Sequence, residues 1–122
     1  MTELRTIPRI ASPFATDVTL PGSKSIALRH LLISSLADGP TRLDGIPRCD
    51  DVDVMFEALR QLGVSVVRNG KSAWLTPPAL PFASDAVLDL GMSGVSLRLL
   101  LAHAALRPST TQFTGHRQPH QR

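Results

Sequence analysis

An internal repeat constrains the fold of this chain more than any other feature of its sequence. The segment Ser25–Leu32 recurs 69 residues later as Gly94–Leu101, and both copies place Leu-Arg shortly before a pair of leucines. Thr41 and Thr110 keep the same offset, and each opens a stretch rich in residues that favour β-strands. Similarity at so long a period indicates a repeated supersecondary unit.

Both copies begin a helix directly after a turn rich in glycine and serine. These turns are Pro21–Lys24 and Gly91–Gly94. The first backbone N–H groups of a helix have no partner within the helix and therefore favour anions. Because Arg29 and Arg98 follow one turn into the respective helices, we expect the two helix starts to form two walls of one anion-binding site.

The order of predicted elements agrees with a repeat. Hydrophobic periodicity and turn residues predict β, α, β, α, β, β, followed by β, α, β and an abrupt end. Ser23 is expected to cap the first helix, and Asp50 or Asp51 the second. The predicted segments are strands at Ala15–Leu20, Thr41–Ile46, Val64–Arg68, Lys71–Thr76, Ala86–Leu90 and Thr110–Thr114, helices that begin near Ser23, Asp50 and Ser93, and a hairpin turn at Asn69–Gly70.

This order predicts an α/β fold of repeated βαβαββ units. One complete unit covers about residues 21–80, and an incomplete second unit covers about residues 85–122, so that residues 21–122 form part of one domain. Repeats of this kind bury their apolar faces against a neighbouring repeat. We therefore expect a fragment, completed by a continuation of the chain or by a complementary chain.

Composition narrows the classes of function. The net charge is only +3 and the 13 basic residues are scattered, so no tract resembles a nucleic-acid-binding arm. Cys49 is the single cysteine, which disfavours a disulfide framework and a CxxC metal site. The N-terminus lacks a signal peptide's apolar core, and Arg98 and His103 interrupt the most apolar helix. We expect a soluble cytoplasmic protein with no metal, nucleic-acid or membrane partner.

Lys24, Ser25 and Arg29 are the candidates for anion binding. A P-loop requires a Gly directly before the Lys, where Ser23 stands, so hydrolysis of a nucleoside triphosphate is disfavoured. Arg29 lies four residues after Ser25, which puts the hydroxyl and the guanidinium on one helix face. A solvated helix start, a buried structural ion pair and a clamp for phosphate or carboxylate all fit these residues.

Other polar side chains are assigned structural roles. The four aspartates between residues 44 and 53 are interpreted as caps and surface groups. His103 is expected to pack on its apolar helix, and His116 and His120 to lie in a solvated tail. Core positions are expected for Met55, Phe56 and Trp74.

Several ordered motifs match one known family. Leu20–Ser25 followed by Arg29 closely resembles the N-terminal signature of the EPSP synthases, which are 3-phosphoshikimate 1-carboxyvinyltransferases. The Asp50–Val52 helix start and the Leu90–Arg98 segment match that family in order and approximate spacing. Phe113–Gly115 fits the beginning of a stretch that carries one of the family's phosphoenolpyruvate-binding arginines. The resemblance covers essentially the whole chain, but only the first part of a full-length family member.

The resemblance implies the enolpyruvyl transferase fold, an inside-out α/β barrel of repeated βαβαββ units, in which residues 1–20 contribute a strand segment that packs with the other domain. It implies a transferase of the shikimate pathway, in aromatic amino-acid biosynthesis, that needs no cofactor. The enolpyruvyl group of phosphoenolpyruvate would move to the 5-hydroxyl of shikimate-3-phosphate, with release of phosphate. Because the family's acid and base carboxylates belong to later parts of its chain, we expect these 122 residues alone to be inactive.

The resemblance also implies site residues. Lys24 would be the catalytic residue, in contact with phosphoenolpyruvate and beside the attacking hydroxyl. Ser25 and Arg29 would hold shikimate-3-phosphate. Gly94 would let the backbone approach phosphoenolpyruvate closely, and Arg122 would pair with the anionic groups of that substrate.

This chain departs from the family pattern beside the expected pocket. Met92–Val95 stands where the family usually has Asn-Ala-Gly-Thr, and Leu99 where it has Pro. These positions border the site at which the herbicide glyphosate competes with phosphoenolpyruvate in the family, so we expect an atypical, glyphosate-tolerant form. The same departures keep a non-catalytic alternative open: an anion-binding or split-subunit module that is active only with its complementary chain.

Overall fold

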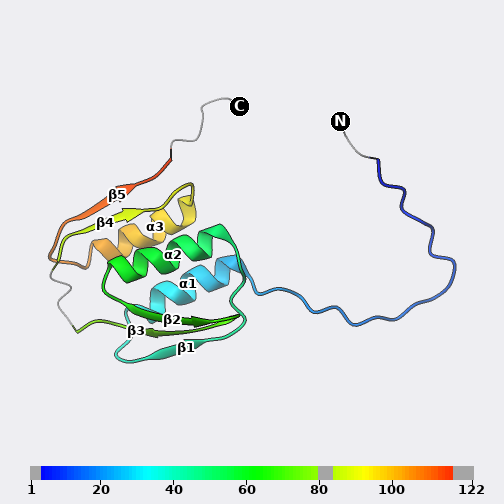
Figure 1. Ribbon diagram of the computed structural model, residues 1–122, viewed down its shortest axis with the longest axis horizontal. Coiled ribbons are helices and arrows are strands. Elements are labelled where there is room, and N and C mark those ends of the chain that lie inside the picture. Colours follow the sequence, from blue (N-terminus) through cyan, green and yellow to red (C-terminus); the bar gives the residue numbers. More distant parts are fainter. Residues whose placement is uncertain (1–3, 80–83, 117–122) are drawn as a thin grey trace.

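In the part of the chain that the structure describes, three helices and two small sheets make up the body of the molecule (Figure 1). The computed structural model describes residues 4–79 and 84–116. In these ranges the helices are α1 (Lys24–Ser34), α2 (Asp50–Gln61) and α3 (Gly94–Ala104). The strands are β1 (Thr41–Leu43), β2 (Ser65–Asn69), β3 (Ser72–Thr76), β4 (Ala86–Asp89) and β5 (Thr111–Thr114). The helices lie side by side, and all three begin at the same end of the molecule (Figure 1).

The first sheet is antiparallel and has the strand order β1-β3-β2. The predicted hairpin between β2 and β3 is confirmed. Asn69 pairs with Ser72, so the two turn residues are Gly70 and Lys71, one position later than predicted. Gly70 has a φ of 59°, a left-handed conformation that glycine adopts at little cost.

The second sheet consists of β4 and β5, which run parallel with Ala86 opposite Thr111. Parallel neighbours need a long crossover, and α3 provides it, so these three elements form a βαβ unit. Both strands therefore end at the same edge of the sheet, at the side where α3 begins. Any ligand bound at that edge would meet strand ends and a helix start together.

Helix α2 is the centre of the core. It contacts α1 and α3 as well as β2 and β4, so it packs on both sheets. The helical spacing seen in its sequence puts one apolar face inward. The largest fully buried apolar side chains in the described part of the chain come from α2 and from the elements around it: Met55, Phe56 and Leu59 on α2, and Leu28, Leu31, Leu75, Leu88 and Leu100 on other helices and strands.

The helical part of the repeat is visible in the burial of side chains. Ser23 caps α1 by accepting a hydrogen bond from the Ile26 N–H, and Ser93 caps α3 in the same way through Ser96. Residues related by the repeat offset are buried at matching places on the two helices. The buried pairs are Ala27 and Ser96, Leu31 and Leu100, and Ser34 and His103.

Helix α2 begins differently from the prediction. Cys49 occupies the N-cap position and makes no side-chain capping bond, so the capping role expected of Asp50 or Asp51 is wrong. Both aspartates lie in the first turn together with Asp53. Carboxylates there stabilise the helix through its dipole rather than through a cap hydrogen bond.

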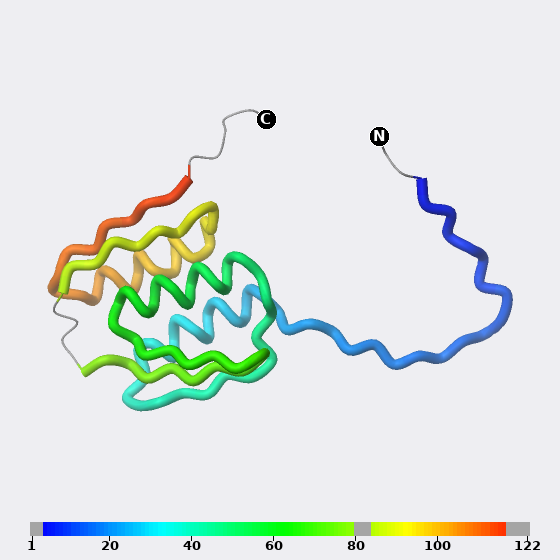
Figure 2. Tube along the Cα trace, viewed as in Figure 1, coloured from blue at the N-terminus to red at the C-terminus, as the bar shows by residue number. Residues whose placement is uncertain are grey.

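The strand predicted at Ala15–Leu20 is not formed. Residues 4–20 have no regular secondary structure and are exposed. Figure 2 shows this N-terminal segment running away from the body. A strand needs a neighbouring backbone to satisfy its hydrogen bonds, and none of the described strands pairs with this segment. Packing of residues 1–20 on another domain stays a prediction.

Trp74 does not belong to the core, because it lies on the outer face of β3 with 38% of its surface exposed. The Arg42 guanidinium stacks over its ring at 5.1 Å from the centroid. Alternation along a strand explains the error, since Ala73 and Leu75 on either side are the residues that point inward. Within the described ranges, no helix has both the length and the apolar character needed to cross a bilayer.

Candidate functional site

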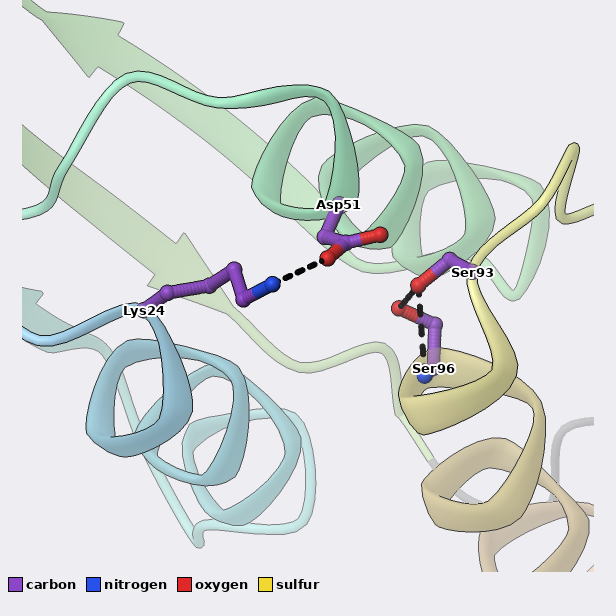
Figure 3. A network of polar contacts seen from close by, with 4 residues as sticks. All are labelled: Lys24, Asp51, Ser93 and Ser96. Carbon is purple, nitrogen blue, oxygen red and sulfur yellow. Dashed lines mark hydrogen bonds and ion pairs between the residues drawn. The ribbon is translucent and has the colours of Figure 1, made fainter.

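The starts of the three helices meet around one ion pair. Lys24, the first residue of α1, lies with its Nζ 2.8 Å from Oδ2 of Asp51 in the first turn of α2. Figure 3 shows the Asp51 carboxylate between Lys24 and Ser93, the N-cap residue of α3. The helix starts predicted to share one site thus lie on the same side of the molecule. Asp51 joins them.

The ion pair fixes the charge state of both partners. A hydrogen bond from Lys24 lowers the pKa of the Asp51 carboxyl, and the Ser93 hydroxyl acts in the same direction. The hydrogen bond to Asp51, followed by the negative charge of that residue, raises the pKa of Lys24. At neutral pH the site therefore holds an ammonium and a carboxylate. The Lys24 side chain is 52% exposed, so water screens much of their attraction.

Ser93 and Ser96 form the polar start of α3. The hydroxyls of Ser93 and Ser96 are hydrogen-bonded with 2.7 Å between their Oγ atoms, and the Ser93 hydroxyl also accepts a hydrogen bond from the Ser96 N–H at 3.4 Å. Both residues are buried. These hydrogen bonds between Ser93 and Ser96 therefore fix the first turn of α3. Ser93 also lies beside Asp51 of α2 (Figure 3).

A cavity of about 460 Å³ opens beside the start of α3, at the ends of β4 and β5. Residues 90–94, Leu97 and residues 113–116 line it. Ligands of open α/β sheets bind at the carboxyl ends of parallel strands, where this cavity lies. Its lining includes Ser93, so the cavity wall and the ion pair share one residue.

Two glycines shape this cavity. A Cβ atom at Gly115 would lie 2.6 Å from the carbonyl oxygen of Gly91, so only glycine permits the close approach of the two loops. The His116 N–H donates to that same carbonyl at 2.9 Å and closes the contact. By contrast, a Cβ at Gly94 would meet no atom within 4 Å, so the space beside Gly94 is open to a ligand.

Ser25 and Arg29 share one helix face, as predicted. Nη1 of Arg29 donates to the carbonyl oxygen of Ser25 at 2.9 Å and also contacts the Ser25 hydroxyl. Arg29 is exposed, and none of the ion pairs in the described part of the chain involves it, so the interpretation as a buried ion pair is wrong. Arg98 is exposed too, while Arg122 lies outside the described residues.

Sequence reasoning missed the roles of Asp51 and His116. Sequence patterns describe Asp51 as a cap or surface group, and its place in the Asp50–Val52 motif is the signal in the sequence that distinguishes it from Asp44 and Asp53. His116, expected in a solvated tail, is exposed but lines the cavity. His103 is buried, as predicted. Within residues 4–79 and 84–116, no group of three or more His, Cys, Asp or Glu side chains is arranged to hold a metal ion.

Comparison with solved structures identifies the class of this fold. An EPSP synthase from Acinetobacter baumannii matches 86% of the chain with a TM-score of 0.73 and 25% sequence identity, over 24% of its own length. The fold is therefore that of the enolpyruvyl transferases, as predicted. The family model of EPSP synthase (3-phosphoshikimate 1-carboxyvinyltransferase) matches residues 8–122, and the chain belongs to this family.

Curated relatives agree with this assignment. A 3-phosphoshikimate 1-carboxyvinyltransferase of Bordetella avium is 43% identical over 104 residues, which cover 84% of this chain and 24% of the relative. One of Phenylobacterium zucineum is 35% identical over 116 residues, covering 94% of this chain and 26% of the relative. The chain thus spans about a quarter of the length of the curated relatives it matches.

Proposed function

We propose that this chain supplies part of the active site of a 3-phosphoshikimate 1-carboxyvinyltransferase. That enzyme would transfer the enolpyruvyl group of phosphoenolpyruvate to the 5-hydroxyl of shikimate-3-phosphate and release phosphate. The observation that carries the proposal is the Lys24 ammonium, 2.8 Å from Asp51 where three helices begin. Two polyanionic substrates repel each other, and a cation together with helix N-termini offsets that repulsion.

The cavity beside Gly94 is the proposed site for phosphoenolpyruvate. The open space at Gly94 and the adjacent start of α3 support this role, because a helix start attracts the phosphate and carboxylate of that substrate. Lys24 is the proposed catalytic cation. Arg122 is proposed to bind phosphoenolpyruvate as well, on the strength of the family resemblance alone.

Ser25 and Arg29 are the proposed binding residues for shikimate-3-phosphate. The guanidinium is exposed and is oriented by two contacts to Ser25, so its remaining N–H groups are available to an anion. A planar guanidinium matches the geometry of a phosphate group. A clamp for a phosphate is therefore favoured over a merely solvated helix start.

The test measures phosphate release from both substrates by the chain joined to, or mixed with, the remainder of the protein. Lys24→Met should lower kcat/KM on the order of 100-fold or more, because a charge-stabilising contact in the transition state is lost. The chain has one other lysine, Lys71, and Lys71→Met is the matched control. Equal turnover by the two variants would contradict the role of Lys24. Glyphosate added to the same assay should inhibit only weakly.

A second candidate is a non-catalytic anion-binding module. Met92 is 64% exposed beside the cavity and Val95 is 41% exposed, and neither offers a polar group to a substrate. In the assay above, binding of phosphoenolpyruvate without phosphate release from the completed protein would favour this candidate. Release of phosphate only in the presence of the remainder favours the transferase.

A further inference from the structure

Asp51 lies at the junction of the three helix starts and contacts Lys24 directly. We infer that Asp51 is a positioning residue, which holds the Lys24 ammonium beside the start of α3 and the cavity wall so that an incoming anion meets an oriented cation. This role rests on the function proposed above. Asp51 need not touch the substrate, because it acts through Lys24.

Lys24 requires an external partner to keep one orientation. It is the first residue of α1, where the positive end of the helix dipole disfavours an ammonium, and the first turn of α1 contains no acidic residue. Its side chain is long, flexible and 52% exposed. Without a carboxylate nearby, the ammonium would extend into water away from the helix starts.

Asp51 is a suitable anchor because its own position is fixed. It lies in the first turn of α2, where a carboxylate is favoured, and α2 is the most buried helix of the core. Its side chain is 27% exposed, about half as much as that of Lys24. The neighbouring carboxylate of Asp53 is engaged elsewhere, with Arg68.

The link to the cavity passes through Ser93. The Ser93 hydroxyl is buried, lies beside the Asp51 carboxylate (Figure 3) and belongs to the cavity lining. Its bonds to Ser96 tie it to the first turn of α3. Lys24, Asp51 and Ser93 therefore form one polar connection from α1 through α2 to the cavity wall.

Removal of the Asp51 charge can either tighten or weaken the binding of an anion, and the direction of that change tests the inference. A carboxylate near an anion site repels the anion, so its removal should tighten binding if charge alone matters. If Asp51 orients Lys24, its removal should weaken binding instead. Asp53→Asn removes an equal charge from the same helical turn without touching Lys24, and it is the matched control.

The first measurement follows Lys24 itself. The chain has only two lysines, Lys24 and Lys71, so ¹³C-dimethylation gives two resolvable side-chain signals in NMR spectra. In Asp51→Asn the Lys24 signal should shift toward that of free dimethyllysine and its pKa should fall, whereas Asp53→Asn should leave both unchanged. Asp51→Glu should restore part of the shift. A Lys24 signal indifferent to Asp51→Asn would overturn the inference.

The second measurement titrates phosphoenolpyruvate into the same variants after each has been joined to, or mixed with, the remainder of the protein. Asp51→Asn should weaken binding about fivefold or more relative to Asp53→Asn, the scale of a partly exposed ion pair. Tighter binding by Asp51→Asn would overturn the positioning role and make Asp51 a competitor of the substrate. If the unsubstituted protein, completed by the remainder, binds no phosphoenolpyruvate, the proposed function fails, and the lysine signals of the chain report separately whether Asp51 holds Lys24.

Discussion

At the scale of single residues, the contact between Lys24 and Asp51 is the feature that a reading of the sequence could not supply. The two residues are 27 positions apart and belong to different helices. Local patterns describe Asp51 as one of several acidic residues at a helix start. Only the tertiary structure shows that Asp51 pairs with Lys24 at the start of α1, whereas Asp53 pairs with Arg68 on β2.

The ion pair between Lys24 and Asp51 also predicts how the stability of the chain depends on pH. The pKa of Asp51 is lowered from 3.8, so its contribution to stability is present above that value and is lost as the pH falls through the lowered pKa. The pKa of Lys24 is raised from 10.5, so its contribution is present below that value and is lost as the pH rises through the raised pKa.

We therefore expect the difference in unfolding free energy between the unsubstituted chain and Asp51→Asn to be constant near neutral pH. It should shrink below about pH 4, where carboxyl groups become protonated. Urea denaturation at a series of pH values measures it. A difference that grows as the pH falls from neutral would contradict the assigned charge states.

At the scale of elements, sequence periodicity predicted α2 well and α1 less well. Helix α2 has one apolar and one charged face, so its inward side is unambiguous. Helix α1 is apolar around much of its circumference, and its apolar side chains include both the buried Leu28 and Ile26, which is 56% exposed. Periodicity cannot choose a face when most faces are apolar. The packing of α1 on α2 makes that choice.

Two adjacent leucines of α3 differ in burial, so their substitution tests which face of this helix packs on the core. Leu100 is fully buried, whereas Leu101 is 50% exposed. Leu100→Ala should destabilise the chain by about 2–5 kcal/mol, since it leaves a cavity in the core. Leu101→Ala should change the free energy of unfolding by only about 0.5 kcal/mol. Urea denaturation of both variants compares them, and equal losses would mean that the helix is rotated from the described orientation.

At the scale of the whole molecule, the body and the N-terminal segment behave as separate parts (Figure 2). The segment exposes apolar side chains that gain no burial from the body. The most exposed examples are Leu4, Ile7, Phe14, Val18 and Leu20. A segment of this composition contributes nothing to the hydrophobic stabilisation of residues 24–116.

Removal of the chain up to Leu20 should therefore leave the stability of the body unchanged. The free energy of unfolding should move by no more than about 0.5 kcal/mol, the range of surface changes that break no packing. Thermal and urea denaturation of the two chains measure this. A marked loss of stability on truncation would show that residues before Pro21 pack on the body in solution.

The sequence by itself determined the hairpin, the helix cap at Ser23, and the shared face of Ser25 and Arg29, because each depends on residues only a few positions apart. It also determined the family, since several motifs occur in a fixed order. Tertiary structure alone decided that Asp51 meets Lys24, that the cavity forms beside Gly94 and that Ala15–Leu20 makes no strand. Those outcomes depend on distant segments, whose contacts arise when apolar faces pack together.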